Sequence, residues 1–183
     1  APDYVPAIAD LSRATAQATP LRVTEIGQKL LPESSSQDRD FQLHHLFAIG
    51  RSRLAWLVST CNDDGIRNEV KGTVKAQELA QQALITLQEM VDQANQNEAL
   101  REELRRDSCS AHKALIVSLA DLGQFDKAKV IALGLQGNLD PNAKGWEADE
   151  RNALESLLDN YIEKKIPFRV AAPQGVVRSC SEK

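Results

Sequence analysis

The sequence predicts an all-α protein built from antiparallel helical hairpins. Proline is absent from Glu33 to Asp140, so the residue that most strongly breaks helices interrupts none of this long stretch. Within it, apolar residues recur at spacings of three and four, which places them on one face of a helix. Aromatic residues make up only 4% of the chain, whereas Ala, Leu and Gln are abundant, and this composition favours helix over sheet.

The length and charge of the chain limit its organisation and its partners. With 183 residues the chain fits one helical domain, which we place at 1–166, followed by a C-terminal tail at 167–183. The net charge of −4 argues against nucleic-acid binding, because a protein that binds phosphates needs a basic face. No apolar run approaches the roughly 18–20 residues needed to cross a bilayer, so we expect no membrane insertion.

The N-terminal part is expected to hold two short helices and a linker. Pro6 and Pro20 suit the first turns of helices at 5–18 and 20–31, since a helix needs no backbone N–H there. The polar, Ser-rich stretch at about 32–40 then indicates a flexible linker.

Three long helices are predicted next, at about 40–61, 67–93 and 97–122. The first has an unusually wide apolar surface, so we expect it to be central. Its apolar residues are Phe41, Leu43, Leu46, Phe47, Ile49, Leu54, Trp56, Leu57 and Val58. The stretch 62–65, with its Asn, two Asp and Gly, is expected to form the turn that follows.

A helical hairpin at 110–142 is the clearest local pattern. Gly123 is a natural C-terminal cap for its first helix, because glycine adopts positive φ at no steric cost. The second helix begins at Phe125, and Gly137 followed by Pro141 is expected to end it.

The C-terminal part is predicted to contain one more helix, at about 147–165. Acidic residues near its start and lysines near its end both complement the helix dipole. Pro167 ends this helix, and Phe168 and Val170 are the apolar residues that could anchor the tail.

The hairpin resembles the second half of a tetratricopeptide repeat. Gly123, Phe125 and Ala128 stand at the spacing G-x-[FY]-x-x-A, and an Ala- and Leu-rich helix leads from them to Pro141. The match covers about one repeat, and Pro141 comes one residue late. Other residues hold the positions where the repeat has aromatic residues or glycine: His112, Ile116 and Leu119. The resemblance implies a short TPR-like α-solenoid; an irregular helical bundle is the alternative.

The resemblance also implies a binding surface. In tetratricopeptide-like proteins the first helix of each pair lines a concave groove, and here that helix would present Lys113, Val117, Ala120 and Asp121. Val117 stands where a polar clamp residue would be wanted, which favours an apolar or helical peptide. The charged stretch 101–107 is most simply a solvated helix face. In a binding role its Arg105 and Arg106 would also contact the partner.

Sequence signatures of catalysis are missing. The chain has no P-loop, no dinucleotide-binding glycine motif and no nucleophile elbow. Cys109 with His112, and Asp40 with His44, have spacings that suit metal ligands, but each pair is a weak signal, and partly exposed or hydrogen-bonded helix residues are the simpler explanation. We therefore predict no catalytic residue, cofactor or metal.

The leading prediction is a non-enzymatic module that binds a peptide or a partner protein in a helical groove. The alternative is a helical sensor that buries a small ligand, which the wide apolar face at 41–58 suggests. The start at Ala1-Pro2 favours an exported protein, periplasmic or secreted, over a cytoplasmic one. The three cysteines at 61, 109 and 180 allow one disulfide; the alternative is that Cys61 and Cys109 are small apolar filler near helix ends. The oligomeric state stays open.

Overall fold

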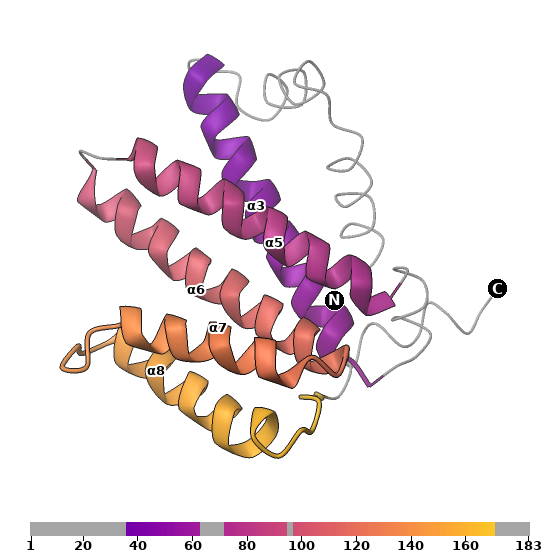
Figure 1. Ribbon diagram of the computed structural model, residues 1–183. Helices are drawn as coiled ribbons and strands as arrows, with labels where there is room; N and C mark the ends of the chain where they lie inside the picture. The colour runs from indigo at the N-terminus through magenta and orange to yellow at the C-terminus, as the bar shows by residue number, and fades with distance from the viewer. Residues whose placement is uncertain (1–35, 63–71, 95–96, 171–183) are drawn as a thin grey trace.

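The computed structural model describes residues 36–62, 72–94 and 97–170, which form helices and connecting turns (Figure 1). Five α-helices pack against one another in these ranges, so the all-α prediction is confirmed for them. They are α3 (Ser36–Thr60), α5 (Gly72–Gln93), α6 (Glu98–Asp121), α7 (Phe125–Asn138) and α8 (Trp146–Leu157), and α8 continues into a π-helical segment, η1 (Leu158–Ile162).

Helices α3, α5 and α6 pack mutually and form the larger part of the core. Helix α5 runs antiparallel to both others, so α3 and α6 are parallel neighbours (Figure 1). Side-chain contacts show the parallel register: His45 meets Asp107 in the N-terminal halves of the two helices, at 2.6 Å, and Ser59 meets Ser118 near their C-terminal ends, at 2.7 Å. On the far side of α6, α7 and then α8 extend the assembly as further helices.

Helix α6 is central, because it contacts α3, α5, α7 and α8. All seven residues from Ala114 to Ala120 are buried, with none of their side chains left on a solvent face. Val117 and Ala120 are each only 1% exposed. The prediction that these two residues line a groove is therefore wrong: α6 is surrounded at this level, and they belong to the core.

The ends of α6 are formed as the sequence indicates. Asn97 caps the start, where its side-chain oxygen accepts the N–H of Leu100 at 3.1 Å. Gly123 follows the helix with φ of 75°, and the N–H of Gln124 donates to the carbonyl of Leu119 at 2.8 Å. The single helix predicted at 97–122 and the turn at Gly123 are thus confirmed.

Two predicted boundaries differ from the structure. Residues 36–40 of the predicted linker are the first turns of α3, while 32–35 lie outside the described residues. Gly137 lies inside α7, which continues to Asn138 before Leu139 turns to an extended backbone. Several other predictions fall outside the described residues: the helices at 5–18 and 20–31, the 62–65 turn beyond Asn62, the start of the 67–93 helix, and Cys180.

The predicted last helix is interrupted. Helix α8 gives way to π-type hydrogen bonds that span five residues, such as Glu163 N–H to the Leu158 carbonyl at 2.9 Å. Lys165 then adopts φ of 54°, which turns the chain back. Residues 166–170, named here the C-terminal strap, run from this turn to the ends of α3 and α6.

The C-terminal strap is held by an aromatic cluster and by polar contacts. Phe168, as predicted, packs on the body: its ring centroid lies 5.5 Å from that of Trp56 and 4.8 Å from that of Tyr161. The N–H of Val170 donates to the carbonyl of Thr60 at 2.8 Å. Arg169 pairs with the Asp121 carboxylate and donates from Nη1 to the carbonyl of Ser59 at 2.8 Å. The strap thereby joins the C-terminal ends of two parallel helices.

Candidate partner-binding site

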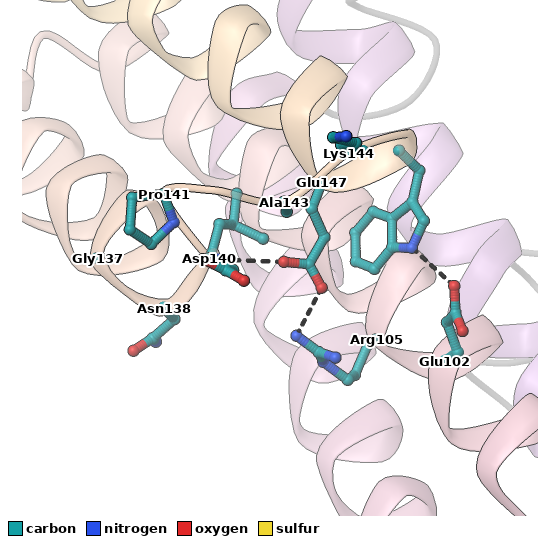
Figure 2. Close-up of a pocket in the computed structure, with 11 residues that line it drawn as sticks. Glu102, Arg105, Gly137, Asn138, Asp140, Pro141, Ala143, Lys144 and Glu147 are labelled. Carbon is teal, nitrogen blue, oxygen red and sulfur yellow. Dashed lines mark hydrogen bonds and ion pairs between the residues drawn. The ribbon is translucent and has the colours of Figure 1, made fainter.

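An open pocket of about 560 Å³ lies between the N-terminal half of α6 and the loop that joins α7 to α8 (Figure 2). We name it the Trp146 pocket. Its wall contains both charged side chains and loop backbone: Glu102, Arg105, Gly137, Asn138, Leu139, Asp140, Pro141, Ala143, Lys144, Trp146 and Glu147.

Glu147 fixes the loop against α6, and Figure 2 shows its carboxylate between the two. One oxygen, Oε2, accepts the backbone N–H of Asp140 at 3.1 Å, and the other, Oε1, accepts from Arg105 Nη2 at 3.0 Å. Gly145, with φ of 75°, allows the chain to enter α8 directly from the loop. Hydrogen bonds within the chain therefore hold the pocket wall in place before any partner protein binds.

Two arginines flank Trp146, the aromatic residue that lines the pocket. The indole Nε1 of Trp146 donates to Glu102 Oε1 at 2.9 Å. The guanidinium carbons of Arg105 and Arg106 lie 5.9 and 5.4 Å from the ring centroid of Trp146, within the range of cation–π attraction. Arg106 Nη2 also donates to Glu102, at 3.4 Å. A half-buried tryptophan is thus flanked by positive charge and hydrogen-bonded on its edge.

A second contact between α6 and α8 lies two turns further along. Lys113 Nζ is 2.6 Å from Glu150 Oε2, a close charge contact between two side chains that are each 21% exposed. Cys109 lies between Arg105 and Lys113 in the sequence and is 5% exposed. Burial, and then the charge of Glu150, raise the pKa of its thiol from 9.0 to about 11. This thiol is not activated as a nucleophile.

Lys113 also lines a smaller pocket, of about 230 Å³, between α3 and α6. Ser52, Arg53 and Trp56 contribute from α3, and Ser110 from α6. Both pockets therefore border α6. Arg105 lines the larger pocket and Lys113 the smaller one, and each of these side chains pairs with a carboxylate of α8.

The structure separates the six residues that were predicted to bind a partner. Arg105 lines the Trp146 pocket and Arg106 lies over its tryptophan, while Lys113 lines the smaller pocket. The Asp121 side chain is 1% exposed and pairs with Arg169, so its role is structural. Val117 and Ala120, as described above, are core residues.

The pocket residues that sequence reasoning missed come from the loop and from α8. Lys144, Trp146 and Glu147 carry no signal in the sequence that connects them to α6. One local feature could have drawn attention to the pocket: a tryptophan stands directly after Gly145, at the end of a turn that contains Pro and Gly and at the expected start of a helix. Its partner Glu102 is 44 residues away.

The structure bears on the two pairs whose spacing suits metal ligands, Cys109 with His112 and Asp40 with His44. His112 Nδ1 donates to the carbonyl of Ser108 at 2.8 Å, with the ring in the tautomer that this bond requires, and burial lowers the pKa of the imidazole. Cys109 holds a free, protonated thiol, so a disulfide through Cys109 is not formed. His44 is exposed, and the Asp40 side chain lies outside the described residues.

None of the helices in 36–62, 72–94 and 97–170 has both the length and the apolar character needed to span a membrane. Comparison with protein-family models, with curated protein sequences and with solved structures finds no match to this chain.

Proposed function

We propose that this chain is a non-enzymatic helical interaction module that binds a segment of a partner protein in the Trp146 pocket. The observation that carries the proposal is an open pocket lined by Trp146 and Arg105, with a second arginine, Arg106, over the same indole ring. Tryptophan and arginine are the residues that most often supply binding energy at protein interfaces.

The order of the pocket wall supports binding as well. Arg105, Glu147 and the Asp140 backbone are already joined by hydrogen bonds of 3.0 and 3.1 Å. A partner would not have to immobilise these groups, and the entropic cost of association is correspondingly lower. The wall thus acts as a preformed surface.

The chemistry of the pocket indicates the kind of segment that fits. The indole of Trp146 offers an apolar contact, while Arg106, 57% exposed at its side chain, and the exposed Lys144 offer positive charge at the rim. We therefore expect an apolar side chain placed against the indole, with an acidic residue beside it. The apolar contact would supply affinity, and the charges would set orientation.

A small ligand is the second candidate, because the pocket volume of about 560 Å³ falls within the range of ligand sites. The apolar face of α3, however, which suggested a buried ligand, is used in packing: Leu43, Phe47, Leu54 and Val58 are at most 6% exposed. A ligand site would therefore be the Trp146 pocket itself.

The test is affinity capture from the native source with three baits. These are the unaltered chain, an Arg106→Glu/Lys144→Glu variant at the pocket, and a Lys127→Glu/Lys164→Glu variant with the same charge change at exposed positions elsewhere. Far-UV circular dichroism first establishes that all three are folded.

We expect one or more proteins to be lost with the pocket variant and retained by the control. Synthetic segments of such a protein, titrated against the chain while tryptophan fluorescence is recorded, then identify the bound stretch. If every captured protein is retained equally by the pocket variant, or if none is captured, the interaction function is rejected. Saturable binding of a small molecule that the same variant abolishes would favour the second candidate.

A further inference from the structure

A cluster of three side chains with metal-binding donors lies between the N-terminal halves of α3 and α6. We name it the His45 cluster; its members are His45, Glu103 and Asp107. One donor atom from each, an imidazole nitrogen and two carboxylate oxygens, lies within 4.8 Å of the other two. His45 Nε2 and Asp107 Oδ2 are 2.6 Å apart. The cluster is separate from the Trp146 pocket, whose residues it does not share.

Helix geometry explains why these residues converge. Glu103 and Asp107 are four residues apart on α6, so they lie one turn apart on the same face. The parallel packing of α3 on α6 then places His45 opposite that face. Two helices position the donors, and helices hold a metal site more precisely than loops do.

The support behind the His45 cluster is apolar and tightly packed. Leu104, between the two acidic residues in the sequence, is fully buried, as are Ala48 on α3 and Ala111 on α6. These residues belong to one core cluster that also includes Leu87 of α5. Because side chains in a dense core resist displacement, the spacing of the two helices at the cluster is fixed.

The donor set suits a divalent transition metal. Neutral imidazole is a good ligand for Zn²⁺, Ni²⁺ and Cu²⁺, and two carboxylates balance the charge of a divalent ion. Exposure increases outward: the side chain of His45 is 13% exposed, that of Asp107 is 28% exposed, and Glu103 is an exposed residue. An ion held here would face solvent on one side, where water could complete its coordination.

We infer that the His45 cluster is a site for a divalent transition-metal ion of the Zn²⁺ class, which joins α3 to α6 when bound. The simpler account of the same atoms is a His45–Asp107 ion pair that happens to lie near Glu103. The two accounts differ at Glu103, which an ion pair does not use but a three-ligand site requires. Glu103 is therefore the residue on which the test turns.

The experiment titrates Zn²⁺ into the full chain after treatment with a chelator, using isothermal titration calorimetry. Its variants are Glu103→Gln, Asp107→Asn and His45→Gln, with Glu98→Gln as a matched control on the same helix. Circular dichroism establishes that each is folded. We expect one equivalent of Zn²⁺ to bind the unaltered chain, and the apparent melting temperature to rise with Zn²⁺ concentration, as for any ligand that binds only the folded state.

We expect each ligand substitution to weaken Zn²⁺ binding by at least about tenfold, since losing even an outer-shell partner costs about 10–100-fold, and Glu98→Gln to leave it unchanged. Replacing Zn²⁺ by Co²⁺ gives a spectroscopic readout of ligand type. The inference is overturned if no saturable one-to-one binding occurs or if Glu103→Gln binds Zn²⁺ as the unaltered chain does. It is also overturned if the Co²⁺ spectrum shows thiolate charge transfer, because cysteines would then be the ligands.

Discussion

Removing the guanidinium of Arg169 should destabilise the fold, because this group closes the C-terminal strap onto two helix ends. It pairs with the Asp121 carboxylate and donates from Nη1 to the Ser59 carbonyl at 2.8 Å. The Asp121 side chain is 1% exposed and that of Arg169 is 26% exposed. Arg169→Met keeps much of the apolar stem and deletes the charge, so it isolates the polar contacts.

The magnitude follows from this unequal burial. Breaking a fully buried ion pair costs about 3–5 kcal/mol, whereas a fully exposed pair contributes about 0–1 kcal/mol. With one partner buried and the other a quarter exposed, we expect Arg169→Met to lower the free energy of unfolding by about 2–3 kcal/mol. A chain of this size loses about 2–4 °C of Tm per kcal/mol, so Tm should fall by about 4–12 °C.

The assay is urea unfolding followed by far-UV circular dichroism. A double-mutant cycle with Asp121→Asn measures the coupling between the two side chains, which we expect to be about 1–2 kcal/mol. Lys164→Met, which removes an exposed positive charge from the same region, is the matched control and should change stability by less than about 0.5 kcal/mol. The reasoning is refuted if Arg169→Met behaves like this control, or if the cycle shows no coupling.

Three further predictions concern other parts of the chain. Gly123→Ala should destabilise the fold by about 1–2 kcal/mol, because φ at this position is +75°. Gly134→Ala should stabilise the fold by about 0.5–1 kcal/mol, because this residue is helical and open space surrounds the added methyl group. Urea unfolding that gives both changes the same sign would contradict these two expectations. Burial lowers the pKa of His112 below 6.5, so the native state binds fewer protons than the unfolded one. The contribution of this shift to stability is complete above pH 6.5 and is lost as pH falls toward the folded-state pKa. His112→Gln should remove this part of the pH dependence of the free energy of unfolding. If the free energies of unfolding of the variant and the unaltered chain change in parallel with pH, the expectation is wrong. The Cys109 thiol, with its pKa raised to about 11, should react with a thiol reagent at neutral pH only as fast as the protein opens, which peptide mapping by mass spectrometry measures. Immediate labelling of the folded chain would show that the thiol is accessible.

Much of the fold could be predicted because its signals are local. The apolar period identifies the long helices, and Gly123 identifies the turn between α6 and α7. The start of α3 could not be placed, since Ser and Asp favour loops and also tolerate the exposed first turns of a helix. The sequence 36–40 is therefore compatible with a loop and with the first turns of a helix, and only the packing further along α3 decides between the two.

The burial of α6 had a signal in the sequence that the repeat resemblance outweighed. Residues 114–120 contain no charged side chain, and a helix that is apolar on all sides is buried on all sides. The resemblance assigned Val117 and Ala120 to a groove from their position in the hairpin alone. That assignment holds only where one face of the helix is left uncovered, and here neighbouring helices cover every face.

The candidate sites could not be predicted because they join distant segments. Trp146 bonds to Glu102 across 44 residues, and His45 meets Asp107 across 62. The spacing of Glu103 and Asp107 on one helix face is visible in the sequence, but their histidine partner depends on α3 lying parallel to α6. That arrangement requires α5, which lies between α3 and α6 in the sequence, to run antiparallel to both, and a local pattern does not encode this direction.

The C-terminal strap has a consequence for the order in which a newly synthesised chain folds. The α6–α7 hairpin closes over a short loop at Gly123 and loses little chain entropy in doing so. Helix α3, made earlier, gains its parallel neighbour only once α6 has emerged. Arg169 then reaches Ser59 across 110 residues, the longest of these connections. During translation the ends of α3 and α6 therefore stay open until residue 169 leaves the ribosome, and closure of the strap is the last of the described helix-joining contacts to form.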